Sequence, residues 1–400
     1  KGFLTEDPAL SKSLLLGRHI FVINDELPTL MKDMGIKAVL ISPLRINDFR
    51  NNEDFQNMFI KNHIKIYVMR DAQEWKNNNE ENGASQLKEV SIEDLLPRNE
   101  IQVDMESVGN MLRDKKILVT GSAGSIGSEM VRQIACYHPE QLILIDQAET
   151  PQHDIRLMME NDYPYIKAET IVTSICRKDR MTEIFNTYKP DYVFHAAAYK
   201  HVPMMEDNPA MAVQNNIYGT RVIADLAVKY GTLKFVMIST DKAVNPTNVM
   251  GCSKRICEIY VQSLNKAIMD GTIQGCTQFI TTRFGNVLGS NGSVIPLFRK
   301  QIQQGGPLTV THPDIIRFFM LISEACKLVL EAGTKGKGGE IFVFDMGKPV
   351  KIAALAQRMI DLSGAKNVTI KYTGLRAGEK LYEEVLNEQE TTKPSFHEKI

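Results

Sequence analysis

Three side chains that can exchange protons stand next to one another at the end of an apolar run. Thr240, Asp241 and Lys242 follow the segment KFVMIS at 234–239. A carboxyl group and an amine in such a position can serve as a general acid and a general base toward a bound molecule. Taken alone, neighbouring Asp and Lys residues are equally typical of a solvated ion pair on a loop. The elements that position them must decide between these two interpretations.

A second pair of residues lies one helical turn apart just downstream. Met250 precedes Lys254 by four residues, so the two share one face of the helix expected over Met250–Met269. A thioether cannot transfer a proton, whereas an amine can. Met250 is therefore either only the first residue of a packed helix or the sign that another group handles the proton at this site.

From Lys116 onward, short apolar runs alternate with helical segments. Regular alternation of this kind predicts a doubly wound parallel sheet, with a ligand crevice at the carboxyl ends of its strands. Thr240 ends one such strand, which places the three polar residues at the crevice. The expected strands are KILVT (116–120), QLILID (141–146), ETIVTS (169–174), DYVFHA (191–196), KFVMIST (234–240), TQFITTRF (277–284) and IFVFD (341–345). The clearest helices between them are Ser125–Cys136, Ala210–Tyr230 and Met250–Met269.

The first of these strands runs into a glycine-rich turn. Gly121, Gly124 and Gly127 form a GxxGxxG pattern between a strand and a helix, and Asp146 ends the next strand. Glycines allow the backbone to approach a pyrophosphate at the helix N-terminus, and an acidic residue about 20 positions later can accept the ribose hydroxyls. Because no arginine stands beside Asp146 to pair with a 2′-phosphate, the pattern favours NAD over NADP.

The chain is predicted to fold as two domains joined by a tether. Residues 1–70 carry their own strands, HIFVIN (19–24), AVLIS (38–42) and KIYVM (65–69), and form a separate small α/β domain. Residues 71–115 are more polar and are assigned to a linker. The larger domain is expected over 116–400, with its cofactor-binding core at about 116–275 plus 341–346. A smaller C-terminal substrate lobe would take up mainly 285–340 and 347–390.

Composition excludes several other classes of function. The formal net charge of −1 gives no electrostatic basis for binding nucleic acid. The six cysteines show no CxxC pair, as expected of a reducing compartment, and no His/Cys/Asp cluster has metal-ligand spacing, so no metal is predicted. No run reaches the ~18 apolar residues of a membrane-spanning helix. The start, KGFLTEDPAL, leads us to expect a piece of a longer protein.

Seven segments in series resemble the extended short-chain dehydrogenase/reductases, which have a Rossmann fold. Within them, the match is to the nucleotide-sugar 4,6-dehydratases of the CapD/WbpM/PglF type, and it covers about residues 90–390. The segments are GSAGSIGSE (121–129), HAAAYKHVP (195–203), NNIYGT (215–220), STDKAVNPTNVMGCSK (239–254), RFGNVLGSNGSVIPLF (283–298), THPDIIRFFM (311–320) and GLRAGEKLYEE (374–384).

The resemblance implies a dinucleotide site and a substrate site. In many extended members an aspartate contacts adenine where this chain has Ser174 and Ile175. The residues implied for NAD are Gly121, Ser122, Gly124, Ser125, Ile126, Gly127, Asp146, Ser174, Ile175, Ala196, Ala197, Ala198, Asn216, Ser239 and Lys254. Those implied for UDP-N-acetylglucosamine are Lys200, His201, Arg283, Asn286, Val287, Ser293, Arg317, Arg376 and Glu379. His195, at a strand end, is expected to be a packed core histidine.

The resemblance also implies a redox-neutral removal of water. Members of this superfamily usually place a tyrosine four residues before the lysine that corresponds to Lys254, and here Met250 replaces it. Oxidation at C4 would acidify the C5 proton, so that Lys242 could act as base and Asp241 as acid for loss of the C6 hydroxyl. Thr240 would relay the C4 hydroxyl proton to Asp241 or to a water near Met250.

Two alternatives stay open. A nucleotide-sugar epimerase would also oxidise C4 but would keep the tyrosine, and an inert NAD-binding regulatory domain would account for the missing phenol alone. The resemblance further implies a homo-oligomer, with dimers formed through the helices around Ala210–Tyr230 and Met250–Met269. It also implies a parent protein anchored to the inner membrane by upstream helices, with this part on the cytoplasmic side. The stereochemical outcome at C5 and the role of the N-terminal domain are left undecided.

Overall fold

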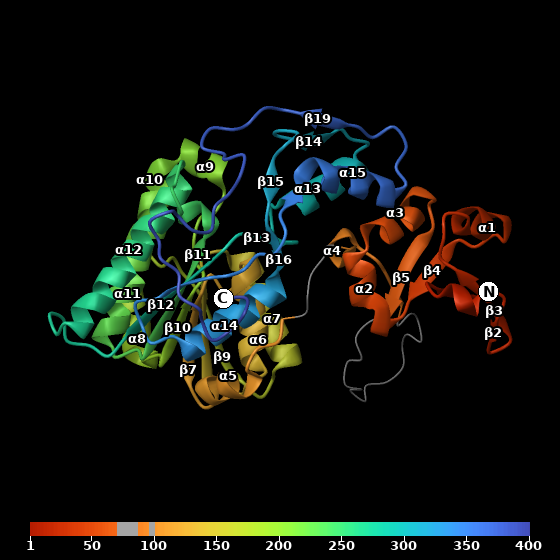
Figure 1. Cartoon of the computed structure of the whole chain (residues 1–400). Coiled ribbons are helices and arrows are strands. Elements are labelled where there is room, and N and C mark those ends of the chain that lie inside the picture. Colours follow the sequence, from red (N-terminus) through yellow and green to blue (C-terminus); the bar gives the residue numbers. More distant parts are fainter. Residues whose placement is uncertain (70–86, 96–100) are drawn as a thin grey trace. The chain divides into compact units, whose positions relative to one another are not determined.

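The computed structural model describes residues 1–69, 87–95 and 101–400 (Figure 1). The chain divides into two compact units. The first comprises Lys1–Glu100, Phe298–Leu308 and Ala354–Ile370, and the second comprises Ile101–Leu297, Thr309–Ala353 and Lys371–Ile400. The segment predicted as a tether, 71–115, therefore ends earlier than expected, because residues from Ile101 onward belong to the second unit. The parts of the predicted linker at 70–86 and 96–100 lie outside the described residues.

The second unit is built on one parallel sheet of seven strands, which confirms the predicted doubly wound fold. The strand order is β17-β12-β11-β10-β7-β8-β9, and every neighbouring pair is parallel. The strands are β7 (Lys116–Thr120), β8 (Gln141–Asp146), β9 (Lys167–Val172), β10 (Tyr192–His195), β11 (Lys234–Thr240), β12 (Gln278–Phe284) and β17 (Ile341–Val343).

Alternate residues of the strands supply two separate hydrophobic cores, one on each face of the sheet. Ile117 and Val119 of β7 join one core, whereas Leu118 between them joins the other. This follows from the two-residue period of a strand. The helices that cover the first face are α5 (Met105–Leu112), α6 (Ser125–Ala135), α7 (Glu149–Asp162) and α14 (Ile322–Lys335). Those on the second are α8 (Lys178–Tyr188), α11 (Gly219–Lys229) and α12 (Val249–Met269) (Figure 1).

The helix predicted over Ala210–Tyr230 is interrupted. It consists of α10 (Pro209–Ala212), a π-helical segment at Val213–Tyr218, and α11. Helix α9 (Val202–Asp207) precedes it. The smaller elements of the C-terminal part are β13 (Asn286–Leu288), α13 (Val294–Gln303), β14 (Leu308–Val310), β15 (Ile316–Arg317), β16 (Phe319–Leu321), β18 (Val350–Lys351), α15 (Ile352–Ser363) and β19 (Ile370–Tyr372).

The first unit contains two short three-stranded sheets. Their orders are β1-β3-β2 and β4-β5-β6, and the pairs β1·β3 and β4·β5 are parallel. One apolar core, with Phe49 and Phe59 almost fully buried, supports this unit. The strands are β1 (Phe3–Thr5), β2 (Leu14–Leu15), β3 (Arg18–Val22), β4 (Ala38–Ile41), β5 (Lys65–Met69) and β6 (Leu87–Glu89). The helices are α1 (Leu27–Asp33), α2 (Ile46–Asn51), α3 (Glu53–Lys61) and α4 (Ile92–Leu95).

Candidate active site

A cleft of about 940 Å³ opens in the second unit beside the carboxyl ends of the central strands. The chain order of the sheet reverses between β7 and β10, since β8 and β9 lie on one side and β11 and β12 on the other. Such a switch point leaves space for a ligand, because the connections on its two sides lead to opposite faces of the sheet. The turn after β7, the loop after β10, the end of β11 and the start of α12 all line the cleft.

The glycine turn leaves no room for side chains at two positions. Gly121 has a φ of +69°, and a Cβ there would lie 2.7 Å from the backbone nitrogen of Ala197. A Cβ on Gly127 would lie 1.9 Å from the carbonyl oxygen of Gly121. The turn and the first part of α6 are therefore in direct backbone contact, and the amino end of α6 faces the cleft at Ser125 and Ile126. A helix N-terminus in this position attracts negative charge.

Asp146 orders the glycine turn from the end of the neighbouring strand. Its Oδ2 accepts a hydrogen bond from the Ala123 nitrogen at 3.1 Å, and its Oδ1 accepts one from the Ala148 nitrogen at 2.9 Å. A carboxylate retains further lone pairs when each oxygen accepts one bond. The backbone N–H groups of the glycine turn therefore suit a pyrophosphate, and the Asp146 carboxylate beside them suits the hydroxyl groups of a ribose.

Several residues predicted to bind the cofactor are not part of the cleft lining: some support it from behind, and Asp146 stands beside it at the glycine turn. Ser122 Oγ donates to Gln152 at 2.8 Å, and Asn216 Nδ2 donates to the carbonyl oxygen of Tyr199 at 2.9 Å. Ile175 packs in the core under α11, which corrects its assignment to the cofactor site. Ser174, Ala197 and Asp146 are likewise absent from the lining, whereas Gly121, Gly124, Ser125, Ile126, Gly127, Ala196, Ala198, Ser239 and Lys254 are part of it.

Thr240 and Lys242 converge on one oxygen of Asp241. The Thr240 hydroxyl donates to Oδ1 at 2.8 Å, and the Lys242 amine donates to the same atom at 2.9 Å. Lys242 Nζ also lies 3.1 Å from Asn286 Oδ1. Thr240 and Lys242 line the cleft, while Asp241 lies beneath them with 1% of its surface exposed. The structure thus brings the three consecutive residues together as one hydrogen-bonded group.

The second oxygen of Asp241 has no protein partner. Oδ2 is buried and receives no hydrogen bond from any residue that the structure describes. Leaving such an atom unpaired costs free energy, typically 1–3 kcal/mol or more for a charged group. A hydrogen-bond donor on a bound ligand or water that reached this oxygen would remove the cost.

Glu383 is a buried carboxyl group near the Lys242 amine, and no pattern in the sequence singled it out. Its Oε1 lies 3.7 Å from Lys242 Nζ and 3.8 Å from Arg317 Nη2. Burial, and to a lesser extent the charge of Asp241, raise the pKa of Glu383, although Lys242 and Arg317 act in the opposite direction. The carboxyl groups of Asp241 and Glu383 therefore both lie beside the Lys242 amine at the wall of the cleft.

Met250 and Lys254 both face the cleft from α12. Met250 is 2% exposed and packs with Met205 and Ala212, so it fills space between helices as well as facing the ligand side. Burial lowers the pKa of Lys254. Nearby, burial lowers the pKa of Lys200, and burial together with Lys200 lowers that of His201.

Most residues predicted for the substrate line the cleft, but Arg283 does not. Its guanidinium is 1% exposed and is bound by Glu258 at 2.8 Å and by Glu390 at 2.8 Å. Burial alone would lower the pKa of Arg283, but hydrogen bonds to these two glutamates outweigh burial and raise it. The predicted substrate role of Arg283 is therefore corrected to a structural ion pair. The members found in the lining are Lys200, His201, Asn286, Val287, Ser293, Arg317, Arg376 and Glu379.

Arg317 is largely engaged by the chain itself. It donates to the carbonyl oxygens of Ile316, Leu381 and Lys380 at 2.7, 3.2 and 2.8 Å. These bonds fix the segment around 380–383 beside the cleft, which places Glu383. In contrast, Ser293 Oγ is buried without a partner among the described residues although its residue lines the cleft.

His195 is a core residue. Its two ring nitrogens lie 2.7 Å from Thr120 Oγ1 and 2.9 Å from Thr220 Oγ1. Burial lowers its pKa to about 3, so the ring stays neutral at physiological pH.

Over the ranges that the structure describes, no group of three or more potential metal ligands lies together. Within the same ranges, no helix has the length and apolar character needed to cross a bilayer.

The fold and the cleft define a Rossmann-type α/β protein of the short-chain dehydrogenase/reductase class, with the ligand site at the switch point. The chain belongs to the polysaccharide biosynthesis protein family, whose model matches residues 117–400. It is 45% identical over 379 residues to the capsular polysaccharide biosynthesis protein CapD of Staphylococcus aureus. That alignment covers 94% of this chain and 62% of CapD, so the chain spans about three fifths of this relative's length.

Two further comparisons cover mainly the second unit. A UDP-glucose 4-epimerase of Rickettsia canadensis is 35% identical over 288 residues, which are 71% of this chain and 81% of the relative. The X-ray structure of Pen from Bacillus thuringiensis is similar with a TM-score of 0.65 and 33% identity. It covers 69% of this chain and 83% of that protein. The structural likeness to Pen shows that the two proteins share this fold.

Proposed function

We propose that the protein is an NAD-dependent UDP-N-acetylglucosamine 4,6-dehydratase, which forms a UDP-4-keto-6-deoxy sugar for glycan biosynthesis. The observation that carries the proposal is the 2.9 Å contact between the Lys242 amine and the Asp241 carboxyl group at the wall of the cleft. Elimination of water needs a base and an acid close together, and these two groups provide both. The family's role in polysaccharide biosynthesis agrees with a nucleotide-sugar substrate.

The cradle of the glycine turn fits NAD. Backbone approach at Gly121 and Gly127, the amino end of α6 and the Asp146 carboxylate would hold the pyrophosphate and the adenosine ribose. Lys254 and Ala196 line the same cleft as Thr240 and Lys242. Bound NAD would supply hydride chemistry, accepting a hydride from sugar C4 and later returning it to C6.

The protons can be balanced with the three adjacent residues. Thr240, whose hydroxyl donates to Asp241 Oδ1 at 2.8 Å, passes the C4 hydroxyl proton to that carboxylate. Lys242 in its amine form removes the C5 proton, and protonated Asp241 gives its proton to the departing C6 hydroxyl, which leaves as water. Lys242 then returns a proton to C5. The substrate loses one water, and each protein group ends in its starting form.

The diphosphate is assigned to basic residues of the lining. Arg376 and Lys200 line the cleft, and neither forms an ion pair with a residue of the ranges 1–69, 87–95 and 101–400. A guanidinium can donate two parallel hydrogen bonds to phosphate oxygens. Ser293 Oγ, buried without a partner among the described residues, would gain one from the nucleotide sugar.

The alternative is a nucleotide-sugar epimerase. It is favoured by the 35% identity to a relative named UDP-glucose 4-epimerase. An epimerase needs proton transfer at C4 only, so it would leave Lys242 without a substrate proton to remove. Incubation of the protein with UDP-N-acetylglucosamine distinguishes the two by mass. Loss of one water without added reductant supports the dehydratase, an isomer of unchanged mass supports the epimerase, and no conversion refutes both.

The proposed roles of Thr240, Asp241 and Lys242 are tested by separate substitutions. Lys242→Ala and Asp241→Asn should retain NAD binding and lower turnover by at least about a hundredfold. Thr240→Val, which keeps the shape of the side chain but removes the hydroxyl, should slow the formation of the 4-keto sugar before water is lost. Near-normal turnover of either Lys242→Ala or Asp241→Asn would contradict the assigned acid and base.

We also propose a dimer through the helices α11 and α12, as the resemblance implies. Exposed apolar side chains lie on α12, at Ile256 and Ile259, and on the π-helical segment before α11, at Val213 and Tyr218. Anchoring of a longer parent protein to the inner membrane, with this part on the cytoplasmic side, is a proposal that rests on the resemblance alone.

A further inference from the structure

The first unit has two sheet edges that face each other. Strand β1 is the outer strand of the sheet β1-β3-β2, and β4 is the outer strand of the sheet β4-β5-β6. Among the residues that the structure describes, neither strand pairs with anything on its other side. Parallel sheets are normally covered on both faces, and an edge strand presents a row of unpaired N–H and C=O groups that can pair with another strand. The two exposed edges therefore need an explanation.

The two edges run in the same direction. At the amino end of β1, Lys1 Nζ donates to the carbonyl oxygen of Met34 at 2.8 Å, and Met34 lies just before β4. At the carboxyl end of β1, Glu6 lies close enough to Arg45 to act on its charge, and Arg45 follows β4. Since each end of β1 lies beside the corresponding end of β4, the strands are parallel neighbours.

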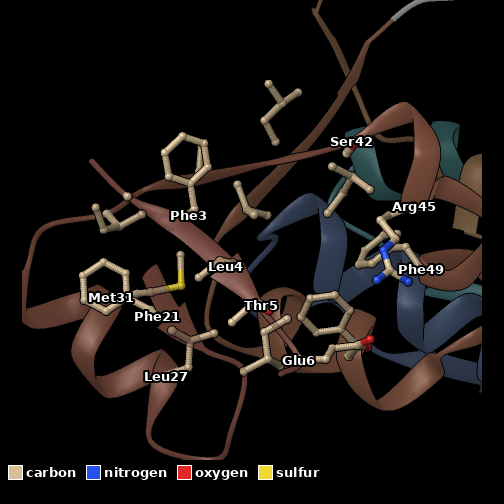
Figure 2. Close-up of a pocket in the computed structure, with 18 of the residues that line it drawn as sticks. Phe3, Leu4, Thr5, Glu6, Phe21, Leu27, Met31, Ser42, Arg45 and Phe49 are labelled. Carbon is tan, nitrogen blue, oxygen red and sulfur yellow. The ribbon is translucent and has the colours of Figure 1, made fainter. Parts of the chain in front are cut away.

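A cavity of about 550 Å³ lies along both strands (Figure 2). Every residue of β1, Phe3–Thr5, and every residue of β4, Ala38–Ile41, lines it. The remaining lining is mostly apolar and comes from β3 and from α1 to α3, and it includes Phe21, Leu27, Met31, Phe49 and Phe55. The space between the strands is thus a slot with apolar walls.

The backbone pattern directs unpaired peptide groups into this slot. Thr5 binds to β3, because its carbonyl oxygen accepts from the Ile23 nitrogen at 2.8 Å. Lys37 binds to β5, because its carbonyl oxygen accepts from the Lys65 nitrogen at 2.9 Å. In parallel pairing, alternate residues bond to opposite sides of a strand. The peptide groups of Leu4 on β1, and those of Ala38 and Leu40 on β4, therefore point toward the slot.

Residues of β1 and β4 are more exposed than residues of β7 and β10, which are paired on both sides in the large sheet. All four residues of β10 are buried, as are four of the five residues of β7. In contrast, Phe3 is 37% exposed and Leu40 is 51% exposed. Apolar side chains of β1 and β4 therefore remain partly uncovered, in addition to their unpaired backbone groups.

We propose that a further parallel β-strand, contributed by the polypeptide that precedes Lys1, inserts between β1 and β4. The first unit would then contain one continuous sheet, β2-β3-β1-strand-β4-β5-β6. The segment should be an apolar run of about five residues, since buried parallel strands are nearly continuous hydrophobic runs. A crossover of about a dozen or more residues must connect its end to Gly2.

Two facts favour this occupant over a separate molecule. Lys1 itself lines the slot, so chain that precedes it emerges beside the edge it would complete. In addition, the aligned 379 residues make up only 62% of CapD, so a relative at 45% identity carries further chain that this one does not match. A strand held by its own chain loses less entropy on docking than a free peptide does.

Amide hydrogen exchange tests the proposal. The 400-residue chain is compared with the natural polypeptide extended by about 40 residues on its N-terminal side, long enough for a strand and its crossover. In the short chain, the Leu4 and Leu40 amides should exchange at least about a hundredfold faster than the Thr5 and Val39 amides, which bond within the sheets. In the extended chain this difference should disappear.

Equal, fast exchange of Leu4 and Leu40 in both chains would overturn the proposal. Protection already present in the short chain would also overturn it. If that protection increased with protein concentration, a second copy would be the occupant.

A matched pair of proline variants gives an independent readout. Leu40→Pro removes an N–H that points into the slot, whereas Val39→Pro removes one that bonds to β5. An edge tolerates proline at an unpaired position. Leu40→Pro should therefore lower the unfolding midpoint clearly only in the extended chain, and Val39→Pro should lower it in both. An equal effect of Leu40→Pro in the two chains would contradict the inserted strand.

Discussion

Replacing Glu383 by glutamine should change the pH dependence of the reaction more than its maximal rate. The substitution preserves the shape of the side chain but removes a negative charge 3.7 Å from Lys242 Nζ. In the proposed reaction Lys242 acts as an amine, and a nearby carboxylate favours the ammonium form. Loss of that carboxylate should extend activity toward lower pH.

The expected size follows from distance and burial. Two unit charges 3.7 Å apart interact by about 4.5 kcal/mol at an effective dielectric constant of about 20, which would correspond to about three pH units. Arg317, at 3.8 Å from the same carboxyl group, offsets part of this interaction. We therefore expect the acidic limb of the profile of kcat/KM against pH to move down by about 1–2 units.

The assay is the initial rate of UDP-N-acetylglucosamine conversion between about pH 5 and pH 9, near the range over which acid and base groups are tuned. The matched control is Glu384→Gln, because Glu384 neighbours Glu383 but pairs with Lys380 at 3.0 Å at the surface. The control should keep the parent profile. If Glu383→Gln gives a profile that superimposes on that of the parent, the carboxylate does not act on Lys242 and the argument from the structure is wrong.

The same variant tests the cause of the raised pKa. A carboxyl group whose pKa is higher in the folded state binds more protons there than when unfolded, so the stability of the fold falls as pH rises between the two values. Glutamine removes this dependence. In urea titrations above that pH interval, Glu383→Gln should therefore be at least as stable as the parent, and a clear loss of stability there would show that the ion pairs of Glu383 outweigh its burial.

Three further substitutions have defined outcomes. Gly127→Ala should weaken NAD binding by at least about tenfold in calorimetry, because its Cβ would lie 1.9 Å from the Gly121 oxygen, and unchanged affinity would refute the backbone contact. Arg283→Met should lower the free energy of unfolding by about 3–5 kcal/mol. Arg255→Met, which removes a more exposed partner of the same glutamates, should cost less than about 1 kcal/mol, and similar costs for both would contradict the burial argument. Met250→Tyr should leave turnover within about tenfold of the parent, and a larger increase would mean that the route of the C4 hydroxyl proton through Thr240 is incomplete.

Local patterns in the sequence were sufficient to locate the large sheet. KILVT at 116–120 and KFVMIST at 234–240 match β7 and β11 residue for residue. A central parallel strand is buried on both faces, so it must be a short uninterrupted apolar run, and its limits can be seen locally. In the first unit the three predicted strands correspond to β3, β4 and β5, whereas β1, β2 and β6 were not predicted. The division of these strands into two sheets depends on what lies beside β1 and β4, which no local pattern contains.

The sequence by itself also determined that a hydroxyl, a carboxyl and an amine group meet at the cleft, because Thr240, Asp241 and Lys242 are consecutive at the end of a strand. Only the tertiary structure decided the roles of residues far apart in the chain. Arg283 and Arg317 are each followed by a phenylalanine, yet Arg283 is bound by Glu258 from α12, and Arg317 is bound by the carbonyl groups of residues 380 and 381. Glu383 and Glu384 are adjacent and chemically identical, and only the fold buries the first beside Lys242 and leaves the second at the surface. A side chain's charge partner is set by distance in space, which the order of residues does not specify.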